Sequence, residues 1–322
     1  MRNTLSIVLA AGIVWFAGAA TAQVYPSRPI TMVVPFPPGG STDVVGRIIV
    51  ERMKTALGQS IIIENVGGAG GSIGVGRVAR AAPDGYTIDV GQWDTHVANG
   101  AVYPLNYDLL RDFEPIGSIS SNPYMLVGRK ALPADDLKGL ISWLKANPDK
   151  GTQGVPTVGA QVAGAYFQRE TGTRFQLVPY RGAAFAVQDV VAGQIDLLFS
   201  QPAVLLPQVR GGSVKPFAVT SPRRLAIAPE IPSVDEGGAP GVYVPGWFAL
   251  FAPKGTPKNI IDKLNAAVIE ATADSNVRAR LAELGQEFYA REQQTPEALA
   301  ALQKADIAKW WPIIKASNIK GE

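Results

Sequence analysis

Apolar residues fall into short runs along most of the chain, and each early run is followed by a turn and then by apolar residues at helical spacing. A β-type run at residues 30–34 leads through a Pro/Gly turn into a helical pattern over residues 43–57. Further strand-like runs at residues 60–64 and 86–90 lie on either side of a second helical pattern, which extends through residues 78–80. Strands that alternate with helices indicate a mainly parallel sheet in an α/β fold.

The alternation continues in the middle of the chain and is followed by a strand and two long helices. The remaining predicted strands cover residues 124–129, 176–179, 195–199, 214–220 and 247–252. The remaining predicted helices cover residues 135–146, 159–170, 183–191, 203–209, 257–274 and 295–315. Strand-like passages near residues 116–129 and 240–251 are candidate crossovers between two lobes, which would make the first domain discontinuous. The length of 322 residues also favours two domains.

The turn after the first strand is a candidate anion site. A helix N-terminus leaves about four N–H groups without intrahelical partners and carries roughly half a positive charge. Gly39 and Gly40 have no Cβ to keep a ligand away, and the hydroxyls of Ser41 and Thr42 can donate hydrogen bonds. These residues favour a bound carboxylate or phosphate. Simple capping of the helix by Ser41, Thr42 or Asp43, with no ligand, remains the alternative.

Two further loops are expected beside this turn. A glycine-rich loop at residues 66–72 follows the second strand, and residues 91–96 follow the third. Ligands of parallel sheets bind beyond the carboxyl ends of the strands, where these loops converge. We therefore predict one pocket lined by all three loops.

Composition excludes several classes of function. The net charge is only +3 and no Lys/Arg cluster occurs, which argues against nucleic-acid binding. The chain has no cysteine, which excludes thiolate metal sites, disulfides and thiol nucleophiles, and its single histidine argues against a catalytic zinc site. We expect no cofactor and no metal.

The first residues have the pattern of a signal peptide. Arg2 precedes an uncharged, mostly apolar run at residues 5–20, and Ala20-Thr21-Ala22 matches an A-x-A cleavage site. This predicts a signal peptide at residues 1–22, cleavage after Ala22 and export to the periplasm. An uncleaved membrane anchor is the alternative, although the run is short for a membrane span.

Short motifs follow one another in order from about residue 25 to the end. They are VPFPPGGSTD (34–43), EN (64–65), GAGG (68–71), PDGYT (83–87), PYRG (179–182), GQID (193–196), PSVDEGG (232–238), APKGTP (252–257) and KLN (263–265). In this order they resemble the Bug receptors, which are the extracytoplasmic solute-binding proteins of tripartite tricarboxylate transporters. The resemblance implies a two-lobed, type II periplasmic-binding-protein fold that closes on a small organic acid and delivers it to a membrane permease. It also suggests a monomer.

The resemblance also implies domain boundaries and site residues. Residues 23–122 and 244–322 would form the discontinuous first domain, and residues 123–243 the second. The implied ligand-binding residues are Phe36, Gly40, Ser41, Thr42, Asp43, Ala69, Gly70, Ser72, Asp94, Thr95, Val158, Gly159, Ala160, Gln161 and Ser200. Among them we expect Ser41, Thr42 and Gly70 to hold the carboxylate. Gln161, Asp94 and Ser200 are expected to set selectivity.

Departures from the family bear on the ligand. Where many relatives have small hydroxyl residues followed by a histidine, this chain has residues 158–161, VGAQ. Ser200 stands where relatives often have an acidic residue, so a partner for a ligand amine is missing and we expect a non-aminated acid. Asp94 stands where a small residue is expected, and a buried carboxylate there would repel a second ligand carboxylate or accept a hydrogen bond. The adjacent Trp93 favours an aromatic or hydroxylated acid, unless it is a core residue.

Two motifs suggest enzymes instead. Residues 70–74 fit the G-x-S-x-G pattern, so a secreted serine hydrolase with Ser72 as nucleophile and His96 as base is the alternative function. However, His96 follows the motif too closely for that family, and the glycine loop extends well past the strand. Residues 74–79 match a loose dinucleotide-binding pattern, but its first glycine would already lie within a helix. We therefore expect a binding protein and not an enzyme.

Overall fold

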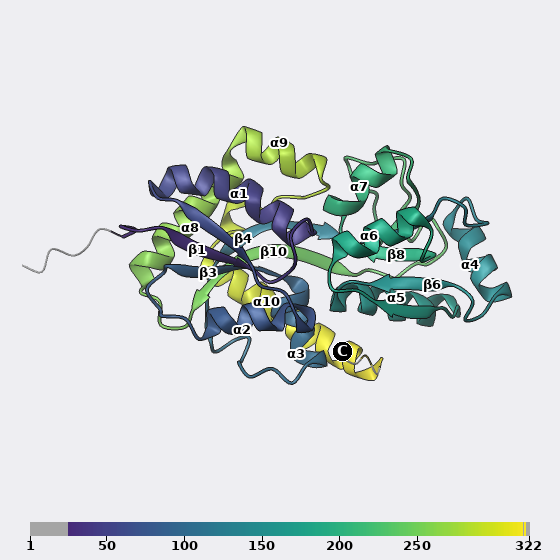
Figure 1. The fold of residues 1–322 in the computed structure, drawn as a ribbon, viewed down its shortest axis with the longest axis horizontal. Coiled ribbons are helices and arrows are strands. Elements are labelled where there is room, and N and C mark those ends of the chain that lie inside the picture. Colours follow the sequence, from purple (N-terminus) through teal and green to yellow (C-terminus); the bar gives the residue numbers. More distant parts are fainter. Residues whose placement is uncertain (1–24, 318, 320–322) are drawn as a thin grey trace, which may run out of the picture.

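The structure is a computed structural model that describes residues 25–317 and residue 319. Within these residues the chain forms two lobes side by side, each a five-stranded sheet flanked by helices (Figure 1). The strand order is β2-β1-β3-β10-β4 in the first lobe and β7-β6-β8-β5-β9 in the second. The predicted signal peptide and its cleavage after Ala22 lie outside the described residues.

The first lobe contains both ends of the described chain. Its strands are β1 (Ile30–Val34), β2 (Ile61–Asn65), β3 (Thr87–Gln92), β4 (Phe113–Pro123) and β10 (Pro245–Pro253). Its helices are α1 (Ser41–Leu57), α2 (Ser72–Ala79), α3 (Asn99–Val102), α8 (Lys258–Ala273), α9 (Ser275–Glu283) and α10 (Pro296–Ala316). Short helical turns are η1 (Ala69–Gly71), η2 (Asp94–Ala98) and η3 (Arg291–Gln293).

The second lobe is formed by one continuous stretch of chain. Its strands are β5 (Met125–Arg129), β6 (Thr152–Val155), β7 (Gln176–Pro179), β8 (Leu197–Ser200) and β9 (Val214–Val219). Its helices are α4 (Leu137–Ala146), α5 (Val158–Thr171), α6 (Ala183–Ala192) and α7 (Pro202–Arg210). The exact domain boundaries given above stay a prediction.

Each sheet has the same pattern of strand directions. β1 is parallel to β2 and β3, whereas β10 is antiparallel to its neighbours β3 and β4. In the second lobe β6 is parallel to β7 and β8, and β5 is antiparallel to β8 and β9. The predicted two-lobed α/β fold with mainly parallel sheets is therefore confirmed.

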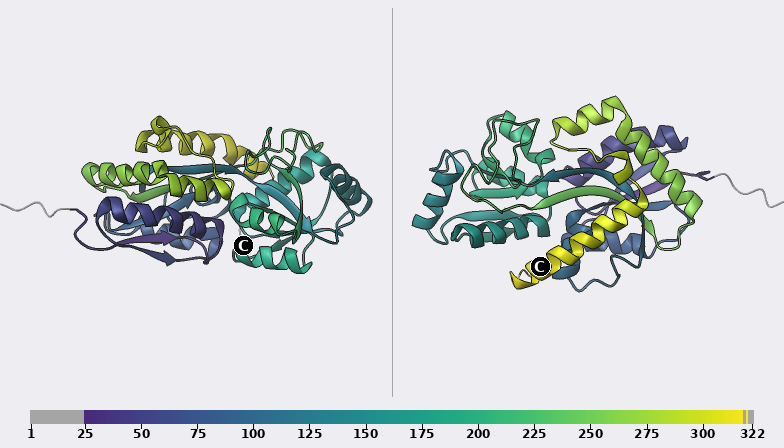
Figure 2. Two further views of the ribbon diagram at one scale, coloured as in Figure 1. Left: turned by 90° about the horizontal axis from the view of Figure 1, so that it is seen from above. Right: turned by 180° about the vertical axis from the view of Figure 1, so that it is seen from behind.

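Both faces of each sheet are covered, which explains the continuous apolar runs of the strands. Along β1, Met32 and Val34 pack on the side of α1 and α8, and Val33 packs on the side of α2 and α10. In the second lobe, α4 and α5 cover one face and α6 and α7 cover the other. The three views agree on these layers (Figure 2).

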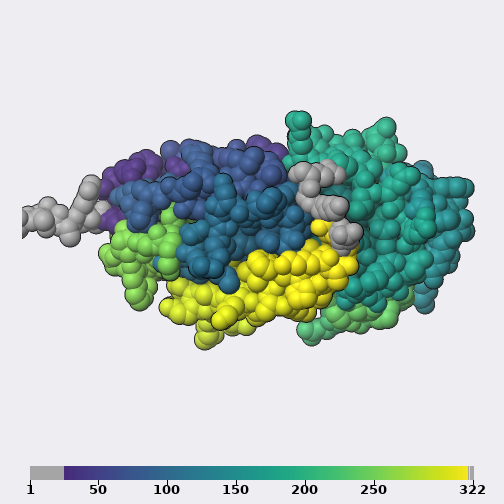
Figure 3. Space-filling view, turned by 90° about the horizontal axis from the view of Figure 1, so that it is seen from below, coloured from purple at the N-terminus to yellow at the C-terminus, as the bar shows by residue number. Residues whose placement is uncertain are grey.

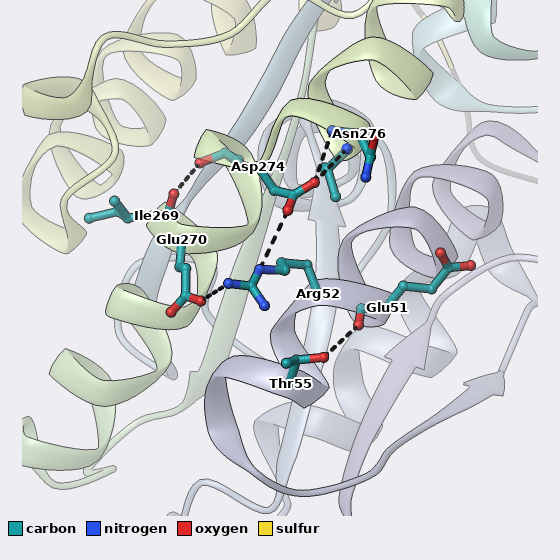
Figure 4. Close-up of polar contacts among 9 residues, drawn as sticks. Glu51, Arg52, Thr55, Ile269, Glu270, Asp274 and Asn276 are labelled. Atoms are coloured by element: carbon teal, nitrogen blue, oxygen red, sulfur yellow. Dashed lines mark hydrogen bonds and ion pairs between the residues drawn. The ribbon is translucent and has the colours of Figure 1, made fainter.

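Three elements were not predicted: the four-residue helix α3, β6 and α9. The sequences of β6 and α9 lack a clear apolar pattern. β6 contains Gln153 and Gly154 in only four residues, and α9 has only two buried residues, Val277 and Leu281. α9 is nevertheless well anchored. Its N-cap Asp274 accepts hydrogen bonds from two backbone N–H groups, and the α1 residue Arg52 contacts both Asp274 and the α8 residue Glu270 (Figure 4).

The chain crosses between the lobes twice, and the crossovers are tied together. The first lies at Tyr124 between β4 and β5, and the second lies between β9 and β10. The Thr220 hydroxyl accepts from the Tyr124 N–H at 2.9 Å and contacts the carbonyl oxygens of Tyr124 at 3.1 Å and Val244 at 3.2 Å. Thr220 is therefore the polar centre of the hinge.

The lobes also touch away from the hinge. Trp310 of α10 packs with its ring centroid 6.3 Å from that of Tyr166 on α5, and Val158 and Val162 of α5 belong to a core cluster of the first lobe. The space-filling view shows α10, in yellow, along one face of the first lobe up to its boundary with the second (Figure 3). The structure is therefore in a closed arrangement.

Candidate ligand site

Two connected hollows lie between the lobes, one large and one small. The outer cavity has a volume of about 650 Å³, and the inner one has room for about 20 Å³. Phe36 of the first lobe and Thr157 of the second line both hollows. The two hollows therefore form one interlobe cleft that these two residues divide.

Loops of both lobes line this cleft. The outer cavity is lined by Phe36, Pro37, Gly67, Gly68, Ala69, Gly70, Gly71, Tyr103, Val155, Pro156, Thr157, Val158, Gln161, Leu177, Pro179, Tyr180 and Arg181. The inner hollow is lined by Phe36, Gly40, Ser41, Thr42, Gln92, Tyr124, Thr157, Ala183, Ser200 and Gln201.

The N-terminus of α1 faces the inner hollow. The helix begins after Gly40, whose extended backbone carries no side-chain cap. Ser41 is 4% exposed, and its hydroxyl has no hydrogen-bond partner among the described residues. A buried hydroxyl without a partner costs roughly 1–3 kcal/mol. This hydroxyl and the first N–H groups of α1 are thus oriented to receive an acceptor.

Thr42 links the helix to the other lobe. Its hydroxyl donates to Gln92 Oε1 at 2.9 Å, and Gln201 Nε2 of the second lobe donates to the same oxygen at 3.3 Å. Gln92 ends β3, and Gln201 directly follows β8. This chain of hydrogen bonds forms one wall of the inner hollow and connects the lobes.

Asp43 turns away from the cleft and orders the loop. Its carboxylate accepts from the Gly39 N–H at 2.9 Å and from Asn65 Nδ2 at 3.0 Å, and it pairs with Arg47 at 2.9 Å. Burial by itself would raise the pKa of Asp43, but the hydrogen bonds from Arg47, Gly39 and Asn65 outweigh burial and lower the pKa. Asp43 therefore fixes the loop that presents Ser41.

The glycine loop forms the opposite wall of the outer cavity in a left-handed backbone. Ala69, Gly70 and Gly71 have φ angles of +46°, +61° and +92°. A Cβ on Gly71 would lie 3.0 Å from the carbonyl oxygen of Pro35 and 2.9 Å from Thr95. Ala69 holds such an angle without being glycine, and strained backbone of this kind concentrates at functional sites.

Asp94 contacts the second lobe and does not line either hollow. Its carboxylate accepts from the Tyr124 hydroxyl at 2.7 Å and from the Gly159 N–H at 2.6 Å. Its side chain is fully buried. Burial raises its pKa, and hydrogen bonds from Thr157, Tyr124 and Gly159 limit the rise.

The single histidine is a core residue. His96 stacks on Phe251 at 3.9 Å between ring centroids, and its Nε2 lies 3.5 Å from the buried carboxyl of Asp89. Burial lowers the pKa of His96 to about 3 and raises that of Asp89, so it disfavours the charged form of both side chains. Its Nδ1 lies 3.0 Å from the Thr95 hydroxyl. Within the described part of the chain, no hydrogen bond joins His96 to Ser72, so His96 is not placed as the base that the G-x-S-x-G interpretation needs.

The outer cavity is mostly apolar and contains one cation. Phe36, Leu177 and the rings of Tyr103 and Tyr180 line it, and the Tyr180 hydroxyl donates to Asp189 at 2.6 Å. Arg181 is the charged residue of the lining and forms no ion pair with any residue that the structure describes. This cavity suits an organic body with negative charge near one end.

Nine of the fifteen predicted site residues line the cleft. They are Phe36, Gly40, Ser41, Thr42, Ala69, Gly70, Val158, Gln161 and Ser200. The other six line neither hollow and are Asp43, Ser72, Asp94, Thr95, Gly159 and Ala160. Ala160 is packed in the core of the second lobe.

Several lining residues were missed. Thr157 is the N-cap of α5, so its position before a helical pattern was an available signal. Gln92 and Gln201 follow the ends of predicted strands and carried the same signal as Ser200. Tyr103 and Leu177 carried none, because nothing in their local sequence indicates that they face a cavity.

Two features are absent from residues 25–317 and 319. No group of three or more His, Asp or Glu side chains is placed to hold a metal ion. No helix combines the length and the apolar character needed to cross a membrane.

Comparison with known proteins gave three kinds of match. Residues 45–319 match the family model described as "Tripartite tricarboxylate transporter family receptor". A curated protein of Agrobacterium vitis, encoded in the TAR-I ttuE-ttuC' intergenic region, is 38% identical and covers 98% of this chain and 91% of its own length. Solved structures are similar as well. MatC from Rhodopseudomonas palustris with bound malate has a TM-score of 0.86 at 38% identity, with 90% of this chain and 100% of MatC covered. The periplasmic binding protein BugD has a TM-score of 0.88 at 36% identity, with 92% and 99% covered.

Proposed function

Because the chain belongs to the tripartite tricarboxylate transporter receptor family, we propose that it is a Bug-type receptor that binds a small organic carboxylate between its lobes at the N-terminus of α1. The ligand occupies the outer cavity, and one oxygen of its carboxylate reaches past Phe36 and Thr157 into the inner hollow to accept hydrogen bonds. Lobe closure buries the ligand from both sides, as expected of a hinge-closing binding protein. MatC, with its bound malate, supports a carboxylate as the ligand class.

One observation carries the assignment of the site. Ser41 Oγ is buried and unpartnered at an uncapped N-terminus of a helix of 17 residues. A carboxylate oxygen is the acceptor that this hydroxyl and the helix dipole both favour. The anion interpretation of the sequence and the geometry agree on this point.

The family is one of periplasmic receptors, and three finer statements belong to this proposal. The protein is exported with cleavage after Ala22. It works as a monomer that delivers its ligand to the membrane permease of a tripartite transporter. It is not an enzyme, and this statement is supported by the core position of His96, whose side chain contacts Asp89 and Thr95.

The proposal is tested first by removing the hydroxyl. Ser41→Ala is expected to weaken binding of a carboxylate by about 1 to 3 kcal/mol, because a hydrogen bond to a charged group is lost. Ser72→Ala is the matched control, since Ser72 also begins a helix but lies outside both hollows. Titration calorimetry with a panel of carboxylic acids that includes malate measures both.

Equal affinity of wild type and Ser41→Ala would contradict the assigned site. Hydrolysis of an ester by the wild type but not by Ser72→Ala would instead favour the serine hydrolase. Mass spectrometry of small molecules released from the denatured protein identifies any acid that co-purifies.

A further inference from the structure

The N-terminus of α5 is occupied by a carboxylate from the other lobe. Asp94 belongs to η2 at the end of the first-lobe sheet, and its Oδ1 accepts from the Gly159 N–H at 2.6 Å. Gly159 is the second residue of α5, a helix of 14 residues. Free N–H groups of the first helical turn and the helix dipole both attract anions. Asp94 thus takes the place that a free anion would take on α5.

The remaining groups around this carboxylate complete its binding site. The Tyr124 hydroxyl at the hinge donates to Oδ2 at 2.7 Å, and the Thr157 side chain adds a further hydrogen bond. Asp94, Tyr124 and Gly159 are all buried in the closed arrangement. One carboxylate therefore joins the first lobe, the hinge and the second lobe.

The backbone of α5 is shaped for this contact. A Cβ on Gly159 would lie 2.0 Å from the Tyr124 hydroxyl and 2.6 Å from Asp94 Oδ1. Real side chains cannot approach so closely, so an alanine at this position would displace the Tyr124 hydroxyl and the Asp94 carboxylate from the N-terminus of α5. Alanine would otherwise favour the helix over glycine.

We propose that Asp94 is a built-in carboxylate that binds the N-terminus of α5 and holds the cleft closed, so that no free anion is required on the second lobe. This inference rests on the proposed function, because it leaves the ligand's carboxylate to the N-terminus of α1 alone. It makes Asp94 a positioning residue for lobe closure and excludes a second ligand carboxylate from α5.

The experiment measures the opening of the ligand-free protein. The chain has no cysteine, so two introduced cysteines can carry spin labels, at the exposed Ile73 of the first lobe and the exposed Gln188 of the second. Pulsed electron spin resonance then gives the distance between the lobes. We expect a single short distance in the labelled wild type, and longer, broader distances in Asp94→Ala and in Gly159→Ala.

A matched control separates closure from helix capping. Asp136 caps α4 by accepting from the Gly139 N–H at 2.7 Å, within the second lobe only. Asp136→Asn is expected to leave the distance unchanged. Because Gly159→Ala removes no polar group and favours the helix, its opening cannot be ascribed to unfolding, which circular dichroism checks.

Rescue by a free anion tests the chemical role of the carboxylate. Sodium acetate is expected to restore the short distance in Asp94→Ala, because acetate can refill the place on α5. It should do so equally in Asp94→Ala combined with Ser41→Ala, which lacks the proposed ligand site on α1. Acetate is expected to leave Gly159→Ala open, since the added methyl group blocks that place.

Three outcomes would overturn the inference. They are a short distance in both ligand-free Asp94→Ala and Gly159→Ala, an opened Asp94→Ala that acetate does not close, and a rescue that is lost when Ser41 is replaced. None of them bears on whether Ser41→Ala weakens carboxylate binding in a protein that keeps Asp94. The two proposals can therefore fail separately.

Discussion

Two polar residues at the start of α1, Ser41 and Asp43, differ in their hydrogen bonding. Ser41 leaves its hydroxyl without a partner in the inner hollow, whereas Asp43, two positions later, is fully engaged with Gly39, Asn65 and Arg47. Helical geometry separates them by about 200° around α1, since each residue turns the helix by about 100°. The unpartnered hydroxyl and the carboxylate that supports the loop therefore lie on two sides of one helical turn.

A prediction at the scale of single residues concerns the buried carboxyl group of Asp89. Both of its carboxyl oxygens are buried without a hydrogen-bond partner among the described residues, and burial raises its pKa. The folded protein therefore keeps a proton on Asp89 that the unfolded chain releases above its ordinary pKa of about 3.9. Stability from this group falls as pH rises, by up to about 1.4 kcal/mol per pH unit.

Asp89→Asn should remove this dependence of the free energy of unfolding on pH. Relative to the wild type, the variant should gain stability as pH rises above about 4, the ordinary pKa of an aspartate in the unfolded chain. Below about pH 6.5 the unfolded chain protonates His96, whereas the folded protein, in which its pKa is about 3, does not. In this range His96 makes the stability of the wild type rise with pH, which opposes the effect of Asp89. Urea unfolding of both proteins at pH 5, 6, 7 and 8 measures the difference. A constant difference would contradict the assigned protonation of Asp89.

At the scale of elements, the N-termini of the helices differ in whether a side chain caps them. α1 begins without a side-chain cap and faces the inner hollow, whereas α9 begins at Asp274, whose carboxylate accepts from the N–H groups of Asn276 and Val277. Figure 4 shows the same carboxylate beside Arg52, which also contacts Glu270. The α9 cap is thus complete within the protein.

Substitutions at Asp274 separate its cap from its ion pair. Asp274→Ala is expected to lower the free energy of unfolding by about 1 kcal/mol, because two N–H groups of α9 lose their acceptor. Asp274→Ser keeps a capping oxygen and should retain most of the stability. Glu270→Ala removes only a half-exposed ion pair and should cost less than about 1 kcal/mol. An equal loss in Asp274→Ala and Asp274→Ser, measured by urea unfolding, would assign the stabilisation to Arg52 instead.

At the scale of the whole molecule, two crossovers and one interlobe carboxylate define the closed form. Thr220 joins both crossovers by hydrogen bonds, and Asp94 joins both lobes to Tyr124 at the hinge. Further contacts between the lobes are the packing of Tyr166 against Trp310 and the hydrogen bond from Gln201 to Gln92. Polar and apolar contacts therefore act together in the closed form.

Thr220→Val tests the hinge. Loss of the hydroxyl leaves the Tyr124 N–H without its acceptor, so the expected destabilisation is about 1 to 3 kcal/mol. Apparent ligand affinity should fall as well, in proportion to the closed fraction. Thr171→Val is the matched control, because the Thr171 hydroxyl is also buried but forms its hydrogen bonds within the second lobe, with Phe167 and Thr173. Small-angle X-ray scattering and calorimetry with the co-purified acid or malate provide the readouts, and equal affinities in the two variants would contradict a hinge role for Thr220.

The sequence by itself determined most of the elements, the two-lobed α/β fold and the turn from which α1 begins. Apolar periodicity encodes which face of a strand or helix is buried, and the Pro/Gly turn before Ser41 encodes a helix N-terminus next to a strand end. β6 and α9 were not predicted, because tertiary packing stabilises them without a strong local pattern.

Only the tertiary structure decided which polar side chains face the cleft. Local sequence could not show that Asp94 reaches Gly159, 65 positions away, or that Thr157, Gln201 and Tyr103 line the hollows. Such contacts depend on how the lobes meet across the hinge. Periodicity records burial within one element, and it contains no information about partners on the other lobe.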